Sequence, residues 1–200
     1  MKTVKDKYNE RCRRMVTDNM QTIIQEISAI SKKIDNSSLN EAVVRILSAK
    51  RVFTAGAGRA GAMMQCMTKR LMHIGLDAYV VGDTITPPAG KGDLLVMGSG
   101  SGETESLVVL AQKAKGLGVQ LLLITTNPKS TIAESSDFVL VIPAGTPKSA
   151  AHGSAAVSVQ PMANLFEQML LICGDAICIE VAREKGMDDD SMFARHANLE

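Results

Sequence analysis

Leu94-Leu95-Val96-Met97 runs directly into Gly98-Ser99-Gly100-Ser101-Gly102-Glu103-Thr104-Glu105, and this stretch decides the fold. The four apolar residues are typical of a buried strand in a parallel sheet. Residues 106–115 predict a helix, because apolar positions recur there at i, i+3, i+4 and i+7. A strand, a loop of glycines and hydroxyl residues, and a helix together present backbone N–H groups and a helix N-terminus to an anion.

The loop itself predicts a phosphate site. Glycine lets the backbone approach a ligand closely and take a positive φ. The hydroxyls of Ser99, Ser101 and Thr104 can donate hydrogen bonds to phosphate oxygens. Ser101 or Thr104 could instead cap the following helix, but a cap needs only one hydroxyl. Because three hydroxyl residues lie among three glycines, we expect these side chains, with Gly100 and Gly102, to bind a phosphate.

A second glycine loop lies earlier in the chain. Residues 51–55 predict a strand and residues 62–74 a helix, and Gly56-Ala57-Gly58-Arg59-Ala60-Gly61 between them matches the dinucleotide fingerprint G-x-G-x-x-G. Asp83 follows the next predicted strand, so a nucleotide-dependent oxidoreductase is one interpretation. Against it, two prolines exclude a regular helix from residues 84–90, and a dinucleotide site needs no second glycine loop.

The rest of the chain alternates strands with helices. Two helices, at about 3–33 and, capped by Ser37 or Ser38, up to Ala49, precede the first strand. Further strands are expected at 77–81, 119–125 and 138–142, a short helix at 130–134, and a long buried helix from Val157 to about Lys185 with Pro161 in its first turn. This pattern predicts an α/β fold, a three-layer α/β/α sandwich around a five-stranded parallel sheet. In the flavodoxin-like order 2-1-3-4-5, both glycine loops meet at the switch point, where ligands bind.

Composition excludes several classes of protein. A net charge of +1 and 3% aromatic residues argue against a nucleic-acid partner. No apolar run approaches about 18 residues and no apolar signal region opens the chain, so we expect no membrane association. Four cysteines without C-x-x-C spacing indicate reduced thiols and a cytoplasmic location. Three scattered histidines predict no metal site, and the 12 methionines are expected mainly in the core.

These residues and motifs resemble the sugar isomerase (SIS) domain family over essentially the whole chain. The segments that carry the resemblance are GAGR at 56–59, RLMH at 70–73, VVGD at 80–83, SGSGET at 99–104, QPM at 160–162, LFEQ at 165–168 and RHANLE at 195–200. The resemblance implies one SIS domain over residues 1–200, with N-terminal helices at 1–49, an α/β core at 50–186 and a C-terminal tail at 187–200 that contributes to the site. It also implies a homotetramer that binds a phosphosugar without a cofactor, with active sites completed by neighbouring subunits.

The last two segments resemble the hexuloisomerase branch of that family. This implies interconversion of 3-hexulose 6-phosphate and fructose 6-phosphate through an enediol, in the ribulose monophosphate pathway of formaldehyde fixation. By the same resemblance Glu167 is the catalytic base, and His196 assists ring opening or proton relay. Gly58, Arg59 and Glu103 join the phosphate loop in binding substrate. The family loop usually has serine where this chain has Ala60, and a lost hydroxyl costs about 0.5–1.5 kcal/mol.

Several assignments stay open on the residues alone. Glu167 could face solvent or support the helix dipole, and His196, close to the chain end, could belong to a frayed tail. Glu103 could stabilise a helix start instead of binding sugar hydroxyls, and Arg59 could meet the sugar, the phosphate or a neighbouring subunit's carboxylate. His73 suits a core position and His152 a flexible loop. Alternative functions are a non-catalytic sugar-phosphate sensor and an isomerase of another phosphosugar.

Overall fold

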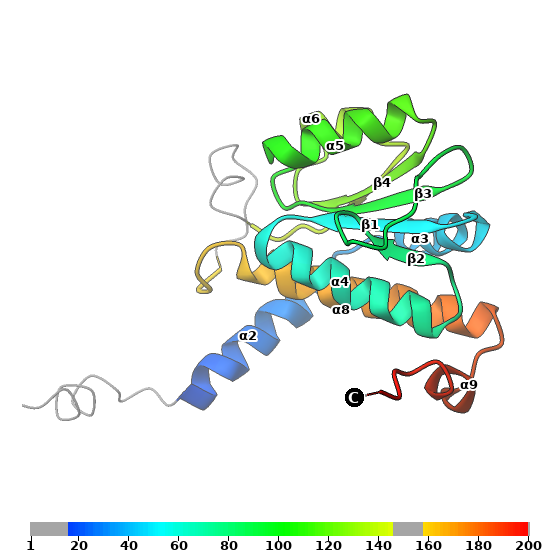
Figure 1. The fold of residues 1–200 in the computed structure, drawn as a ribbon. Coiled ribbons are helices and arrows are strands. Elements are labelled where there is room, and N and C mark those ends of the chain that lie inside the picture. Colours follow the sequence, from blue (N-terminus) through cyan, green and yellow to red (C-terminus); the bar gives the residue numbers. More distant parts are fainter. Residues whose placement is uncertain (1–15, 146–157, 200) are drawn as a thin grey trace, which may run out of the picture.

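The computed structural model describes residues 16–145 and 158–199. In chain order its elements are α2 (Val16–Ser31), α3 (Asn36–Ser48), β1 (Val52–Gly56), α4 (Gly58–His73), β2 (Ala78–Val80), β3 (Leu94–Gly98), α5 (Glu105–Gly116), β4 (Gln120–Thr125), α6 (Thr131–Ser135), β5 (Phe138–Val141), α8 (Asn164–Glu184) and α9 (Asp189–Phe193). Figure 1 shows a central sheet with helices above and below it. The three-layer α/β sandwich predicted from the sequence is confirmed.

The sheet is parallel, with strand order β2-β1-β3-β4-β5. This is the predicted order, and it places the ends of β1 and β3 side by side: Gly56 is paired with Gly98. β3 is buried along its whole length, as expected for the middle strand of a covered sheet. Each glycine loop therefore leaves the sheet at the same edge, next to the other.

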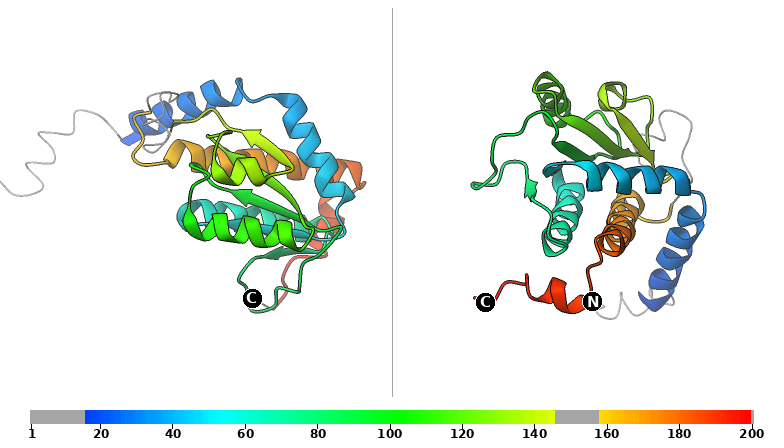
Figure 2. Two further views of the ribbon diagram at one scale, coloured as in Figure 1. Left: turned by 90° about the horizontal axis from the view of Figure 1, so that it is seen from above. Right: turned by 90° about the vertical axis from the view of Figure 1, so that its right-hand side faces the viewer.

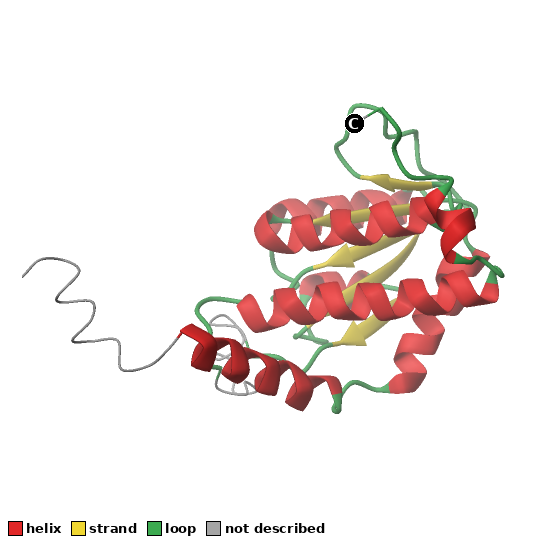
Figure 3. Ribbon diagram, turned by 90° about the horizontal axis from the view of Figure 1, so that it is seen from below, coloured by secondary structure: helices red, strands yellow, loops and turns green. Residues whose placement is uncertain are grey.

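Two apolar cores hold the layers together. On one face the sheet packs against α5 and α6. On the other it packs against α3, α4 and α8, and the end of α2 joins this core through Ile30. Figures 2 and 3 show the second group of helices lying across that face of the sheet. None of the helices in the described residues is long and apolar enough to cross a membrane.

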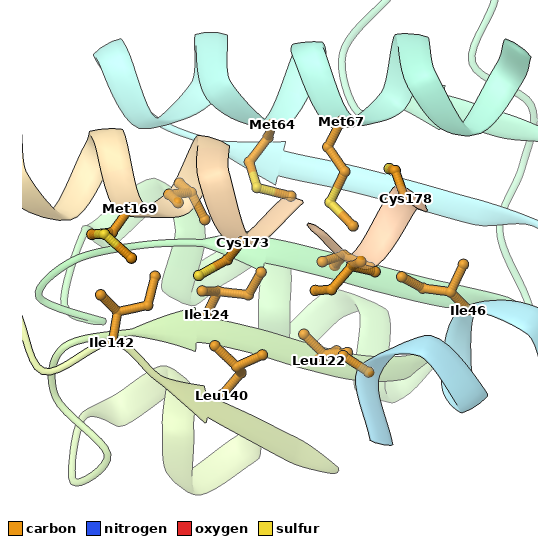
Figure 4. Packing of buried hydrophobic residues seen from close by; sticks show 14 of the residues in the cluster. Ile46, Met64, Met67, Leu122, Ile124, Leu140, Ile142, Met169, Cys173 and Cys178 are labelled. Carbon is orange, nitrogen blue, oxygen red and sulfur yellow. The ribbon is translucent and has the colours of Figure 1, made fainter. Parts of the chain in front are cut away.

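The longest helix, α8, lies between α4 and the sheet. Figure 4 shows its Met169, Cys173 and Cys178 pointing toward side chains of α4 and the strands, with Met64 and Met67 approaching from α4. These three methionines fill the core, in line with the sequence expectation. Burial raises the pKa of the Cys173 thiol to about 11 and that of Cys178 to about 12, so both remain protonated at neutral pH.

Three helix starts differ from the sequence prediction. The cap of α3 is Asp35, whose carboxylate accepts the N–H groups of Ser37 and Ser38, so neither serine is the cap. Helix α4 begins at Gly58, inside the glycine loop, rather than at residue 62. Helix α8 begins at Asn164 and not at Val157, because Met162 has a φ of 57°, which ends any right-handed helix before it.

The N-terminal prediction is tested only in part. Residues 1–15 lie outside the described residues, and α2 ends at Ser31, two residues before the expected end. Its buried Ile30 covers the core, whereas Val16, Met20 and Ile24 are exposed along one side of the helix. Residues 84–90 form turns and irregular chain, as their prolines predict.

Candidate active site

The phosphate loop, residues 98–104, is fixed through its carbonyl groups. The Gly100 carbonyl accepts hydrogen bonds from Thr126 Oγ1 at 2.7 Å and Thr126 N at 3.2 Å. A trans peptide points its C=O and N–H in opposite directions, so the N–H of Ser101 points away from Thr126. Within the described part of the chain, the N–H groups of Gly100 and Ser101 have no hydrogen-bond partner. They are available to an anion.

The three loop hydroxyls line a single cavity. Ser99 Oγ accepts the N–H of Gly102 at 3.1 Å, and Ser101 Oγ accepts the N–H of Glu103 at 3.2 Å. Each of these hydroxyls keeps its own O–H to donate. Thr104 occupies the N-cap position of α5, but its side chain makes no capping bond. The capping interpretation therefore fails for Ser101 and Thr104, and their hydroxyls face the cavity together with Ser99.

The cavity has a volume of about 260 Å³ and lies at the switch point of the sheet. Three helix N-caps contribute to its wall: Ala57 of α4, Thr104 of α5 and Ala163 of α8. Helix N-termini carry partial positive charge, so their convergence favours an anionic ligand. The full lining is Ala57, Ala60, Gly98, Ser99, Gly100, Ser101, Thr104, Leu107, Met162, Ala163, Phe166 and Glu167.

Two loop glycines are required by the backbone. Gly102 has a φ of 66°, and a Cβ there would lie 1.9 Å from Ser130 Oγ, far inside van der Waals contact. Gly58 has a φ of 58° and open space around it, so its requirement is conformational only. Gly58 and Gly102 thus shape the two loops, while Gly100 and Ser101 reach the cavity.

Glu167 lies in the cavity wall and forms an ion pair with Arg59. The distance from Arg59 Nη1 to Glu167 Oε2 is 3.1 Å, and the glutamate side chain is 15% exposed. Arg59 Nη1 also donates to Asn164 Oδ1, one turn earlier on α8. A carboxylate and a guanidinium from two helices therefore meet at the rim of the cavity, beside the phosphate loop. Such a pair can move a proton and stabilise a developing oxyanion.

Glu103 and His196 lie away from this cavity. Both carboxylate oxygens of Glu103 accept hydrogen bonds from Thr131, one from its N–H and one from its hydroxyl, each at 2.8 Å. Glu103 thus binds the start of α6, the helix-start role left open on the sequence. The ring of His196 stacks on His73, with ring centroids 5.4 Å apart. His73 ends α4, whereas Arg59 begins it; fourteen residues of helix place them about 21 Å apart.

The tail, with α9, packs at the far end of α4 and α8 (Figure 1). His73 is buried there, as its core interpretation requires, and burial together with Lys69 and Arg70 lowers its pKa. A larger cavity of about 590 Å³ also lies at this end, lined among others by Arg70, Cys178 and Met187. It has no glycine loop, and its thiol is protonated. The chemistry therefore favours the smaller cavity. His152 falls outside the described residues.

The SIS domain profile matches residues 45–173 of this chain. The chain belongs to the SIS domain family. A Bacillus subtilis (strain 168) protein named 3-hexulose-6-phosphate isomerase is 42% identical over 184 residues, covering 92% of this chain and 98% of that protein. One of the same name from Mycobacterium gastri is 37% identical, covering 92% of each.

A solved structure extends this likeness to three dimensions. It is a Methanococcus jannaschii protein inferred to be a 3-hexulose-6-phosphate isomerase, with a TM-score of 0.78 and 30% identity. It covers 92% of this SIS chain and 99% of its own. The function predicted from the sequence is confirmed at the level of enzyme class, because relatives matched over nearly the full length are isomerases. This SIS protein is an isomerase, and neither the oxidoreductase nor the sensor interpretation is retained.

Sequence reasoning did not identify two features of the site. Asn164 bridges to Arg59 from the position three residues before Glu167, and that spacing on one helix face was a usable signal. Met162 lines the cavity with a left-handed backbone, for which the sequence gave no sign. Among residues 16–145 and 158–199, no group of three or more His, Cys, Asp or Glu could hold a metal ion.

Proposed function

We propose that this isomerase interconverts 3-hexulose 6-phosphate and fructose 6-phosphate through a 2,3-enediol, with no cofactor. The observation that carries the proposal is that the phosphate loop and Glu167 line one cavity. A phosphate held by Ser99, Gly100, Ser101 and Thr104 would leave the sugar carbons toward α8. The names of the full-length relatives support this substrate pair.

In the proposed reaction, the Glu167 carboxylate removes the proton from C2 of the 3-keto sugar. The C–H electrons form the C2=C3 bond, and the C3 carbonyl oxygen gains a proton to complete the enediol. The C2 hydroxyl then loses its proton as C2=O forms, and Glu167 returns its proton to C3. Arg59, 3.1 Å from Glu167, is placed to stabilise the enediolate charge. Atoms and electrons balance without an external reductant.

We infer that His196 and the tail act in the site of a neighbouring subunit. In its own chain His196 lies about 21 Å of helix from Arg59. Phe193 is 77% exposed and Leu199 99% exposed, which suits a tail that packs on another copy. The exposed Val16, Met20 and Ile24 of α2 also support association, and we propose a homotetramer. The free thiols of Cys173 and Cys178 support a cytoplasmic location.

The test is proton exchange of fructose 6-phosphate in heavy water, followed by NMR. Exchange at C3 is expected, because the 2,3-enediol forms by loss of that proton. Exchange at C1 instead would place the carbonyl shuttle between C1 and C2 and overturn the substrate assignment. Ligand-induced shifts without exchange would contradict catalysis altogether.

Glu167→Gln supplies the matched variant for this test. The amide keeps the size of the side chain but cannot accept the proton, so we expect kcat to fall about 10²–10⁴-fold. KM should change little, since the phosphate loop is untouched. An unchanged exchange rate at C3 would remove Glu167 from the role of base.

A further inference from the structure

Glu26 on α2 binds the chain segment that leads into α8. Its Oε2 accepts the hydroxyl of Ser158 at 2.7 Å and the side-chain N–H of Gln160 at 2.9 Å, and its Oε1 accepts the N–H of Val159 at 2.9 Å. Ser158 Oγ in turn accepts the N–H of Gln160 at 3.0 Å. One carboxylate thus fixes three consecutive residues more than 130 positions away in sequence. We call these four residues the Glu26 network.

The network is joined to the cavity by a short, stiff connection. Only Pro161, Met162 and Ala163 separate Gln160 from the first residue of α8. Proline fixes its own φ, and Met162 takes a left-handed conformation with a φ of 57°. A non-glycine residue keeps that conformation only where its surroundings impose it. Met162 and Ala163 both line the candidate cavity, so the position of Gln160 determines that wall.

The same connection determines where Glu167 sits. The first helical hydrogen bond of α8 runs from the Glu167 N–H to the Ala163 carbonyl at 3.0 Å. Helix α2 lies outside residues 45–173, the part that matches the family, yet it supplies the carboxylate that fixes this start. Gln160 is 9% exposed, and its Oε1 has no partner in the described part of the chain. The amide is therefore oriented by Glu26 alone.

We propose that Glu26 is a positioning residue of this isomerase: from α2 it fixes residues 158–160, and thereby the start of α8 and the placement of Glu167. The inference rests on the proposed role of Glu167 as base. The competing explanation is that Glu26 only helps to dock α2 and affects stability alone.

Three variants separate these explanations by kcat, KM and thermal unfolding. Glu26→Ala should lower kcat about 10- to 100-fold, the usual effect of a small misplacement of a catalytic group, with KM changed less than threefold. Ile30→Ala is the matched control, because Ile30 is buried one turn further along α2 and has no part in the network. It should lower the melting temperature at least as much as Glu26→Ala while kcat stays within twofold. An equal loss of kcat in both variants, or no loss in Glu26→Ala, overturns the proposal.

Gln160→Glu sharpens the test through its pH profile. It places two carboxylates at hydrogen-bond distance, which raises the pKa of one of them. Its kcat should therefore fall as pH rises, in a step that the wild type lacks. Combining it with Glu26→Gln restores one carboxylate and one amide, and should recover kcat to within about threefold of wild type. Failure of the double variant to recover activity contradicts the proposal.

Amide hydrogen exchange tests the network without any substrate. Glu26→Ala should accelerate exchange of the Val159 and Glu167 amides and leave that of Ile177, deeper in α8, unchanged. Unaltered exchange at Glu167 overturns the inference whatever the substrate is. Turnover of fructose 6-phosphate by the wild type tests the proposed function separately.

Discussion

Ala60 lies in the wall of the candidate cavity, at the position where the resemblance leads us to expect a serine. Its methyl group makes no hydrogen bond, so a phosphate there has one donor fewer than it would have with serine. The substitution changes a single neutral hydrogen bond and leaves the backbone of the loop as it is. This makes Ala60 a test of where the phosphate sits.

We expect Ala60→Ser to lower KM for fructose 6-phosphate about two- to tenfold, the equivalent of about 0.5–1.5 kcal/mol for one neutral hydrogen bond. The kcat should stay within twofold, because the hydroxyl meets the phosphate in ground and transition state alike. Ala62→Ser, on the exposed side of the same helix, is the control. An unchanged or higher KM for Ala60→Ser would place the phosphate away from this residue.

Individual site residues could be predicted where local pattern determines them. The hydroxyls of Ser99, Ser101 and Thr104 reach one cavity because a single loop carries them. The partners of Arg59 and Glu103 could not be predicted, since they come from residues 108 and 28 positions away. Such contacts depend on how elements pack, and no local spacing reports them.

Asp93 fixes the start of β3 to the start of β1. Its carboxylate accepts Arg51 Nε at 3.1 Å, Arg51 Nη2 at 2.7 Å and the N–H of Gly90 at 2.8 Å. Burial raises the pKa of Asp93, but the hydrogen bonds and the charge of Arg51 outweigh it and hold the pKa below 3.8. Asp137, bonded to Lys115 and the N–H of Leu121, is lowered in the same way.

A depressed folded-state pKa gives stability that is fully present above the unfolded value and is lost as pH falls through the folded value. We therefore expect the free energy of unfolding to be flat between about pH 5 and 7 and to fall below about pH 4. Asp93→Asn should cost about 1–3 kcal/mol at pH 7 and reduce that fall. Urea unfolding at the two pH values measures both. An equally steep acid loss in Asp93→Asn would contradict the assignment.

The elements themselves were largely predictable, because apolar runs and glycine loops determine strands and turns locally. The strand order also followed, since short right-handed crossovers leave few topologies. The start of α8 could not be predicted. Residues 157–163 have helix-compatible composition, but Glu26 binds residues 158–160 and Met162 turns left-handed. Asp35 was passed over as the α3 cap because two serines beside it carry the same signal.

Seen as a whole, the molecule separates its two candidate catalytic groups. Helices α4 and α8 both begin at the cavity, and the tail with His196 lies at their other ends (Figure 1). Because about 21 Å of helix lies between them, one chain cannot bring Glu167 and His196 together. The proposed chemistry therefore needs two chains for each site.

Subunit complementation tests this arrangement. Glu167→Gln and His196→Ala should each be nearly inactive alone. Co-expressed in equal amounts, they should recover on the order of a quarter of wild-type activity, because random association gives one site in four both intact groups. Co-expression of Glu167→Gln with itself under two tags is the control. If the mixture stays as inactive as its parents, His196 does not serve a neighbouring site.

The main chain supplies much of the candidate phosphate site, through the loop amides and three helix N-termini. Substitution of a side chain, proline apart, does not remove a peptide N–H. The sugar end of the cavity is different: Ala60, Met162 and Phe166 meet the ligand through side chains alone. A descendant of this gene can therefore drift toward a new sugar by ordinary point mutation while its grip on the phosphate is inherited with the fold.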